Sequence, residues 1–402
     1  MSILRFEFQD DSRSPWHLEP VEFSELTLLV GISGAGKTLT LNSIAAVCAA
    51  ARGRNSGLYD CRWAIEIATD AGTLTWRATT GGAPPIQAVT TRVHVDVDDA
   101  SGSGVEFHGE RRSPPTFVEE LIQDAEGRSL VHRTKGEIRL AGSDRPIRMK
   151  DSESVVSLLQ DEETMAPLFQ ALRKVHRSSP AQWSYIPFDP NRVRQLEEST
   201  DSVEALREAT IPIGQKAYLL QRRFGSEFAA VLDAYREIFP QVREIKIGPT
   251  SELGLRSTED EQSTSYEFLG IAIEENGVGS AISWENMSSG MRRTLRHLFE
   301  LELSPRGTVL LVDEYENSMG VNCLDAVTER LLSPSRDLRL IITSHHPYVI
   351  NNVPMNLWRV VTRKGSNVRI VPASEIPELD TRSKQDAFIR LLNAAEYREG
   401  IQ

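Results

Sequence analysis

The stretch Gly31-Ile32-Ser33-Gly34-Ala35-Gly36-Lys37-Thr38 matches the phosphate-binding loop G-x-x-x-x-G-K-[ST] at every fixed position. An apolar run over 26–30 predicts a buried strand before it, and residues 39–51 predict a helix after it. The glycines let the backbone curl, so that N–H groups and the positive helix end can face phosphate oxygens. Lys37 would reach the terminal phosphates, and the Thr38 hydroxyl would ligate Mg²⁺. The stretch predicts a nucleotide-binding site, and an ordinary glycine-rich turn is the alternative.

A second apolar run, Val309-Leu310-Leu311-Val312, ends in two adjacent carboxylates, Asp313 and Glu314. Buried parallel strands deliver such acids to their carboxyl ends, where α/β proteins bind ligands. Asp313 is the candidate for the Mg²⁺ shell. Glu314 is the candidate for polarising the attacking water, because phosphoryl transfer needs an oriented nucleophile more than covalent help. A purely structural strand is the alternative, and the phosphate loop upstream argues against it.

A serine-glycine motif, Ser288-Ser289-Gly290, precedes a predicted helix with Met291, Leu295, Leu298 and Phe299 on one face. The capped helix end could offer N–H groups and hydroxyls to a γ-phosphate. Serines are also good helix caps, so a simple N-cap is locally an equally good explanation.

A third apolar run ends in Ser344-His345-His346-Pro347, where the ligand edge of the sheet is expected. Either imidazole could reach the γ-phosphate or the attacking water, and His345 is the preferred candidate. A single histidine in such a place is otherwise usually structural.

The bulk composition limits the classes of protein. With 402 residues, of which 40% are hydrophobic, the chain is expected to be globular with two or three packed subdomains. A net charge of −12 argues against a surface made for nucleic acid or membrane, so any DNA contact would need a local patch. No apolar run is long enough to span a bilayer, and three dispersed cysteines suit a reducing compartment. We expect a cytoplasmic protein without a membrane partner or a zinc or iron site.

Four regions are expected in an α/β fold. Residues 1–60 would form an N-terminal lobe with the phosphate loop, and 61–150 an inserted antiparallel β subdomain with a hairpin around Asp70-Ala71-Gly72. Residues 151–241 would form a helical subdomain, whose helical spacing includes Val175. Residues 242–402 would form a C-terminal lobe with the serine-glycine motif, the Asp-Glu strand and the histidine.

Taken in this order, the four motifs resemble an ABC-type ATPase, whose fold is a P-loop head with a mixed sheet. More narrowly, Ile211-Pro212-Ile213-Gly214, Glu316-Asn317 and the Ser-His-x-Pro form resemble the OLD-like and RecF-like group of AAA family ATPases. The resemblance implies ATP and Mg²⁺ as ligands and a homodimer or higher oligomer that sandwiches ATP. Ser288 and Gly290 would then act in trans, Asn317–Asn322 would cross the dimer, and His345 would be the switch residue.

The resemblance also bears on function. After His346 too little chain remains for the nuclease that often follows OLD-like ATPases, and no Asp-x-Asp occurs there. We therefore expect a stand-alone ATPase gating a separate effector protein, a nuclease or toxin, as in the PARIS, Septu and retron-associated phage-defence systems. A RecF-like repair ATPase that binds DNA through Arg222-Arg223 or Arg292-Arg293-Arg296 is the main alternative. A transporter subunit is less favoured. A glutamine loop could fall at any of four residues: Gln160, Gln182, Gln195 or Gln215.

Overall fold

The computed structural model describes residues 2–12, 15–54, 57–82, 115–134, 136–143, 145–179, 183, 186–254, 267–332, 337–379 and 389–391. The sequence pattern also predicts a strand over 93–97, loops over 101–104, 113–115 and 257–265, and a final helix over 383–396. Apart from residues 115 and 389–391, these segments lie outside the described residues, as does Gln182.

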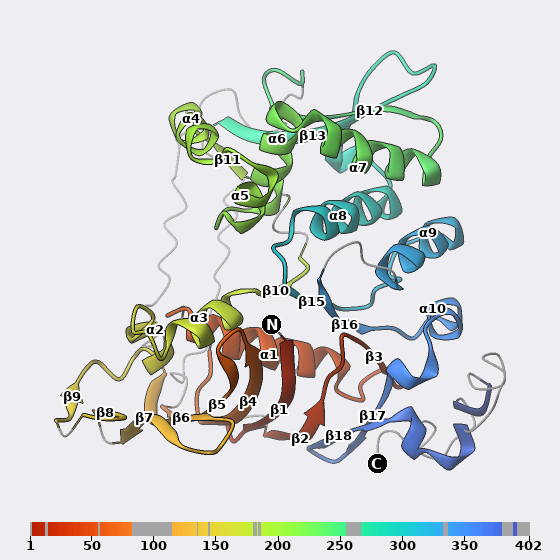
Figure 1. Ribbon diagram of the computed structural model, residues 1–402. Helices are drawn as coiled ribbons and strands as arrows, with labels where there is room; N and C mark the ends of the chain where they lie inside the picture. The colour runs from red at the N-terminus through yellow and green to blue at the C-terminus, as the bar shows by residue number, and fades with distance from the viewer. Residues whose placement is uncertain are drawn as a thin grey trace, which may run out of the picture.

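Parallel strands form one end of the main sheet (Figure 1). Their order is β10 (Val175–Arg177), β15 (Val309–Val312), β16 (Arg339–Thr343), β3 (Leu26–Val30) and β17 (Trp358–Lys364). Every residue of β3 and β15 is buried, as expected for strands covered on both faces. Because these strands run in one direction, the residues that follow β3, β15 and β16 emerge at the same edge of the sheet.

Mostly antiparallel strands continue the same sheet beyond β17, with a parallel pair between β18 and β2. Next to it lie β18 (Asn367–Pro372), β2 (Trp16–Glu22), β1 (Ser2–Asp10), β4 (Cys61–Thr69), β5 (Gly72–Gly81), β6 (Thr116–Asp124), β7 (Ser129–Thr134), β8 (Glu137–Leu140) and β9 (Ile147–Arg148). Within the described residues the sheet has fourteen strands. The predicted hairpin is confirmed, since Thr69 pairs with Gly72 between β4 and β5. The antiparallel region thus extends the sheet that carries the glycine-rich loop.

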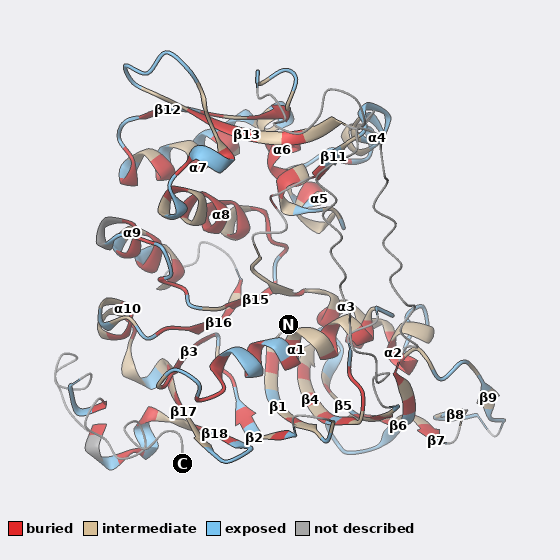
Figure 2. Cartoon of the chain, turned by 180° about the vertical axis from the view of Figure 1, so that it is seen from behind, coloured by how far each residue is buried: buried red, intermediate tan, exposed pale blue. Residues whose placement is uncertain are grey.

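Helices cover both faces of the parallel strands. Leu29 belongs to a core with α1 (Lys37–Ala51), α2 (Val155–Leu158) and α3 (Ala166–Arg173). Leu28 and Val30 belong to the opposite core, with α8 (Ser289–Leu303), α9 (Val321–Leu332) and α10 (Pro347–Asn352). Successive residues of a strand point to opposite faces, so one apolar strand supplies both cores. Figure 2 shows the resulting concentration of buried residues along the strands of the main sheet.

A helical lobe stands above the main sheet in Figure 1. It contains α4 (Pro190–Ser199), α5 (Val203–Glu208), α6 (Ile213–Arg223) and α7 (Gly225–Ile238), with a small sheet of β11 (Ile186–Phe188), β13 (Glu267–Glu275), β12 (Val242–Pro249) and β14 (Ile282–Ser283). Helix α8 packs beneath α6 and α7, and the Tyr235 hydroxyl donates to the Met291 carbonyl at 3.2 Å. The lobe is therefore attached to the main sheet through α8.

One sequence-based expectation is wrong. Val175 was expected to continue a helix, but Val175–Arg177 forms strand β10, which pairs in parallel with β15. The helical spacing ends at Arg173, the last residue of α3. A three-residue strand carries no periodicity of its own, and its pairing with β15 is a contact between segments distant in sequence.

Candidate nucleotide-binding site

The glycine-rich loop connects β3 to α1 without room for larger residues. A Cβ on Gly31 would lie 2.6 Å from the Val361 carbonyl oxygen, and Gly34 and Gly36 have φ of 85° and 107°, which favour glycine. Gly36 is the N-cap of α1 and supplies no side chain to the first N–H groups of the helix. These groups can therefore be satisfied by an anion, as a phosphate-binding loop requires.

Lys37 is held over this loop. Its Nζ donates to the carbonyl oxygens of Gly31 at 2.6 Å and Ile32 at 3.0 Å, and the residue is only 9% exposed. Burial lowers the pKa of Lys37, while the nearby carboxylates of Asp313, Glu316 and Glu314 oppose this shift. A cation is thus fixed against the loop by backbone oxygens that phosphate oxygens could replace.

Asp313 and Thr38 come together from segments far apart in sequence. The Thr38 hydroxyl donates to Asp313 Oδ1 at 3.1 Å, and the Thr343 hydroxyl donates to the same oxygen at 2.8 Å. The pairing of β15 with β16, and of β16 with β3, places these strand ends side by side. Hydroxyl and carboxylate oxygens are the ligands that Mg²⁺ prefers, so the residues present fit this ion.

Glu314 follows Asp313 on an exposed turn with a φ of 43°, an uncommon conformation for a residue with a side chain. Its N–H donates to the Thr343 hydroxyl at 2.7 Å, and Asn317 Nδ2 donates to its carboxylate at 3.1 Å. Arg293 Nη2 donates to the carbonyl of Asp313 at 2.8 Å and to that of Glu314. Neighbouring elements therefore hold this turn in its strained form.

The two histidines have different surroundings. His345 is exposed, its N–H donates to Glu316 Oε1 at 2.8 Å, and its Nδ1 lies 3.1 Å from the same oxygen. His346 instead caps α10, because its Nδ1 accepts the N–H of Tyr348 at 3.2 Å. Because His346 caps a helix, His345 is the better candidate for contacting a bound nucleotide.

The serine-glycine motif forms the start of α8. Ser288 is the N-cap, and its hydroxyl accepts the N–H of Met291 at 3.2 Å. Ser288 and Ser289 are exposed. A Cβ on Gly290 would lie 2.9 Å from the Ser318 carbonyl oxygen, so this turn packs closely on the loop after Glu314. The N-cap expected as one alternative is present, and the exposed hydroxyl and loop form one continuous surface.

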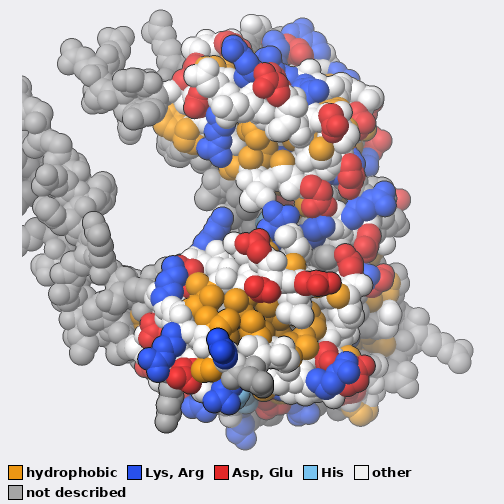
Figure 3. All heavy atoms as spheres, turned by 60° about the vertical axis from the view of Figure 1, so that its left-hand side comes forward, with side chains coloured by type: hydrophobic (Ala, Val, Ile, Leu, Met, Phe, Trp, Pro, Cys, Tyr) orange, Lys and Arg blue, Asp and Glu red, His pale blue; other side chains and the backbone are white. Residues whose placement is uncertain are grey.

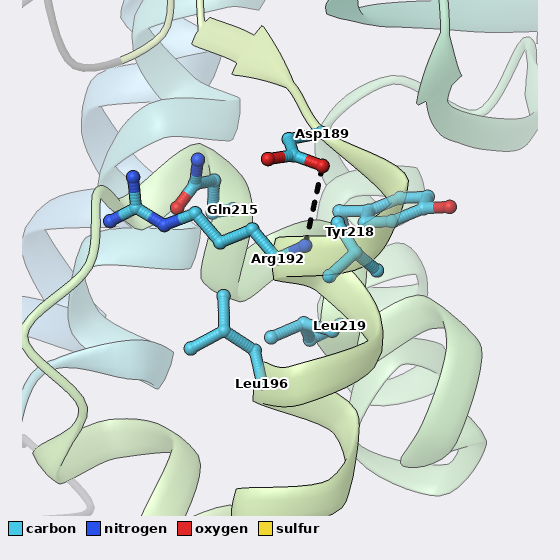
Figure 4. Close-up of a pocket in the computed structure, with 7 residues that line it drawn as sticks. Asp189, Arg192, Leu196, Gln215, Tyr218 and Leu219 are labelled. Carbon is cyan, nitrogen blue, oxygen red and sulfur yellow. Dashed lines mark hydrogen bonds between the residues drawn. The ribbon is translucent and has the colours of Figure 1, made fainter.

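Sequence reasoning missed Arg177, Thr343, Arg293 and Glu316 as site residues. Thr343 could have been found as a polar residue ending an apolar strand, whereas Arg177 follows no motif. Among the glutamines proposed for a glutamine loop, Gln215 lies in the helical lobe, where it lines a small pocket with Asp189 and Arg192 (Figure 4). Arg177 lies in the same part of the chain as these four glutamines. Its Nη2 is 3.3 Å from Asp313 Oδ2.

The described residues contain no cluster of three or more His, Cys, Asp or Glu residues suited to a metal ion. None of their helices has the length and apolar character needed to cross a membrane.

The parallel strands, the phosphate loop and the acidic strand end have the arrangement of a P-loop nucleotide-binding protein. Residues 129–351, just over half of the chain, match the family described as "AAA domain, putative AbiEii toxin, Type IV TA system", and the chain belongs to this family. The matched range includes Ser288, Asp313 and His345 and begins after the phosphate loop. No curated protein matches the sequence.

Three solved structures are similar to this chain at low identity. An SMC head bound to the C-winged helix domain of ScpA has a TM-score of 0.46 and 13% identity, over 92% of this chain and 98% of that chain. The SMC head domain from Thermotoga maritima has 0.41 and 11%, over 92% and 99%. The Pyrococcus furiosus Smc head domain with an extended coiled coil, bound to the C-terminal domain of ScpA, has 0.47 and 12%, over 92% and 95%.

Proposed function

We propose that this protein binds and hydrolyses ATP in the cytoplasm, that two copies close over the nucleotide, and that this closure gates a separate effector. The observation that carries the proposal is the meeting of Lys37, Thr38 and Asp313 at one edge of the sheet. These residues belong to segments 275 positions apart, and each has the chemistry that a triphosphate site needs.

The position of each residue supports a proposed role. The loop Gly31–Thr38, including Ser33 and Ala35, would bind phosphates through its N–H groups and Lys37. Thr38 and Asp313 would hold Mg²⁺, which neutralises charge on the phosphate oxygens. Glu314 would orient the attacking water, since its carboxylate is exposed and steadied by Asn317. His345 would contact the reacting end of the nucleotide from the neighbouring strand.

Self-association is proposed because Ser288, Ser289 and Gly290 lie at an exposed helix start, with Ser288 accepting only one of the free N–H groups. A symmetric pair would let the turn of one copy face the phosphate loop of the other. Each copy would then carry one half of two identical composite sites.

Mixing two inactive chains tests this arrangement. Lys37→Ala removes the phosphate contact of one half, and Ser288→Arg blocks the other, so each chain alone should fail to hydrolyse ATP. An equal mixture should recover about a quarter of wild-type turnover, because half of the randomly formed dimers carry one intact site of two. If both chains fold and pair, and the mixture stays inactive, the shared-site proposal is wrong.

The Glu314→Gln variant tests hydrolysis and closure together. Its amide cannot polarise water, yet every other contact of the site is kept. We expect ATP to remain bound and the mass measured by light scattering to double on adding ATP, with ADP having no such effect. Wild-type rates of hydrolysis in this variant would remove Glu314 from the proposed role.

The effector and the role in antiphage defence rest on the resemblance to OLD-like ATPases and on family membership. We propose a protein partner, a nuclease or toxin, released or activated when the ATP-bound state changes. Isolating Glu314→Gln with ATP from its native host and identifying the bound protein tests this part. Recovery of the ATP-bound dimer alone, under conditions that preserve other known complexes of that host, would count against it.

The basic surfaces suggested for DNA are not present in the expected form. Arg222 pairs with Glu197 at 2.7 Å, and Arg223 donates to backbone carbonyls. Arg296 is 6% exposed, and Arg293 is engaged with the turn at Glu314. On the face drawn in Figure 3, basic and acidic side chains are interspersed. We therefore do not favour the DNA-repair alternative.

A further inference from the structure

We propose that Arg177 is a cation that exchanges partners: it neutralises Asp313 when Mg²⁺ is absent and contacts the terminal phosphate of ATP when Mg²⁺ is bound. This inference rests on the proposed function and names an additional positioning residue for it. The exchange would explain how a nucleotide site can keep its acidic residue compensated in both states.

The first step is the place of Arg177 in the fold. It is the last residue of β10, the edge strand beside β15, and its backbone register opposite Leu311 carries its side chain toward the acidic strand end. Its Nη2 lies 3.3 Å from Asp313 Oδ2, and its Nη1 donates to Asn42 on α1. The guanidinium therefore lies between the strand that bears Asp313 and the helix that follows the phosphate loop.

The second step concerns the partners of the Asp313 carboxylate. Two neutral hydroxyls, from Thr38 and Thr343, donate to Oδ1, while Oδ2 lies 3.3 Å from the Arg177 guanidinium. A carboxylate that is 20% exposed is stabilised by such a partner. Mg²⁺ held by Thr38 and Asp313 would bring a second, stronger cation to the same group.

The third step is where Arg177 would go. Two cations beside one carboxylate repel each other, and the Arg177 side chain is 36% exposed, so it can move at small energetic cost. A triphosphate offers oxygens that a planar guanidinium can contact through two N–H groups. The terminal phosphate is the group that distinguishes ATP from ADP, so Arg177 should contribute to that discrimination.

The experiment compares ATP and ADP affinity in full-length protein by calorimetry, with Glu314→Gln as the background so that ATP is not consumed. Arg177→Ala and Arg177→Lys are measured with saturating Mg²⁺ and with EDTA. Arg222→Ala is the matched control, because Arg222 is also partly exposed and paired with a carboxylate, but lies in the helical lobe. Thermal unfolding without nucleotide checks that each variant folds.

With Mg²⁺, Arg177→Ala should weaken ATP binding at least tenfold and ADP binding less than twofold, the size expected for a charge-assisted hydrogen bond. With EDTA the effect on ATP should be smaller, because Arg177 then stays with Asp313. If Arg177 acted only through its charge, the loss of ATP affinity would be larger in EDTA than in Mg²⁺, since free ATP carries more negative charge than its Mg²⁺ complex.

An equal or larger effect on ATP in EDTA, or equal losses for ATP and ADP, would overturn the exchange. Arg177→Lys keeps the charge but not the planar fork, so it should recover part of the loss and show the same Mg²⁺ dependence. If Arg177→Ala does not fold, Arg177→Lys still decides by that dependence. If the unmodified background binds neither nucleotide, the proposed function itself fails, which is a different result from normal binding insensitive to Arg177.

Discussion

At the scale of single residues, Gly31 shows how a missing side chain shapes the site. Its Cα faces the Val361 carbonyl on β17, and a Cβ would approach that oxygen to 2.6 Å. Backbone atoms cannot move aside as a flexible side chain can, so the loop or β17 would have to shift. The glycine required by the sequence motif is therefore also required by packing within this chain.

We predict that Gly31→Ala lowers the free energy of unfolding by about 1–3 kcal/mol, as overpacking does, and weakens ATP binding. Gly279→Ala is the control, because nothing lies within 4 Å of its Cβ position and its φ is not in the left-handed region. Urea unfolding and ATP titration measure both effects. A Gly31→Ala protein as stable as Gly279→Ala would show that the loop is not confined as described.

Short sequence motifs are enough to select some of the candidate site residues. Lys37, Thr38, Asp313 and Glu314 could be chosen in this way, although their roles remain predictions. Arg177 could not, because its position depends on β10 lying beside β15, and no local pattern specifies that pairing. Glu316 was noticed only through a family resemblance, and its contact with His345 required the three-dimensional structure.

At the scale of elements, a buried ion pair attaches the short helix α2 to the antiparallel strands. Glu120 on β6 and Arg133 on β7 are both fully buried, with Arg133 Nη1 2.7 Å from Glu120 Oε2. The Val155 N–H, at the start of α2, donates to both oxygens of Glu120 at 3.0 and 3.1 Å. Arg133 also donates to the Glu153 carbonyl at 2.8 Å. The pair thus joins two strands and a helix end.

Arg133→Met should reduce the free energy of unfolding by about 3–5 kcal/mol, because Glu120 loses its buried cation and must hold a proton to stay buried. Glu120→Leu added to it should recover much of the loss, since an apolar pair needs no compensation. Chemical denaturation at pH 7 measures both. Additive losses in the double variant, or no loss in the single one, would mean that Glu120 and Arg133 do not stabilise the fold as a pair.

The same variant should depend on pH in a defined direction. Burial raises the pKa of Glu120 to about 8, against the opposing effects of Arg133 and the Val155 N–H. Without Arg133 the pKa rises further, so the folded protein binds a proton that the unfolded chain releases near its ordinary value. The stability of Arg133→Met should therefore fall as pH rises from about 5 to 8, by up to about 1.4 kcal/mol per pH unit. The double variant should lack this slope.

The apolar periodicity of the sequence predicted the longer helices and strands better than it predicted how they pack together. The apolar runs before the glycine-rich loop and before Asp313 became β3 and β15, and the face of α8 with Leu295 and Phe299 is buried. The sequence did not show that the antiparallel strands join the main sheet through β1 and β4. Pairing between distant strands produces no periodic pattern in the sequence. The proposed boundaries at 60, 150 and 241 stay predictions.

At the scale of the whole molecule, a buried polar cluster connects the main sheet to α8. Ser178, directly after β10, donates to both oxygens of Glu300 at 2.9 and 2.8 Å. Glu300 also contacts His297 Nδ1 at 3.1 Å and is 3% exposed. Arg177 touches Asp313 and the next residue touches α8, so two consecutive residues link the nucleotide site with the helix that begins at Ser288.

Ser178→Ala should loosen this link without removing any group from the nucleotide site. A buried carboxylate that loses its hydroxyl donor is destabilised by about 1–3 kcal/mol, and the loss should appear as local opening of α8. Hydrogen exchange of peptides from residues 289–303 should accelerate in nucleotide-free protein, while peptides from 129–134 in the distant strand β7 keep their rates. Ser226→Ala is the control, because the Ser226 hydroxyl also bonds a glutamate, Glu227, at an exposed position. Unchanged exchange in α8, or equal acceleration throughout the chain, would mean that the lobes are held together by apolar packing and that Ser178 has no special part in their connection.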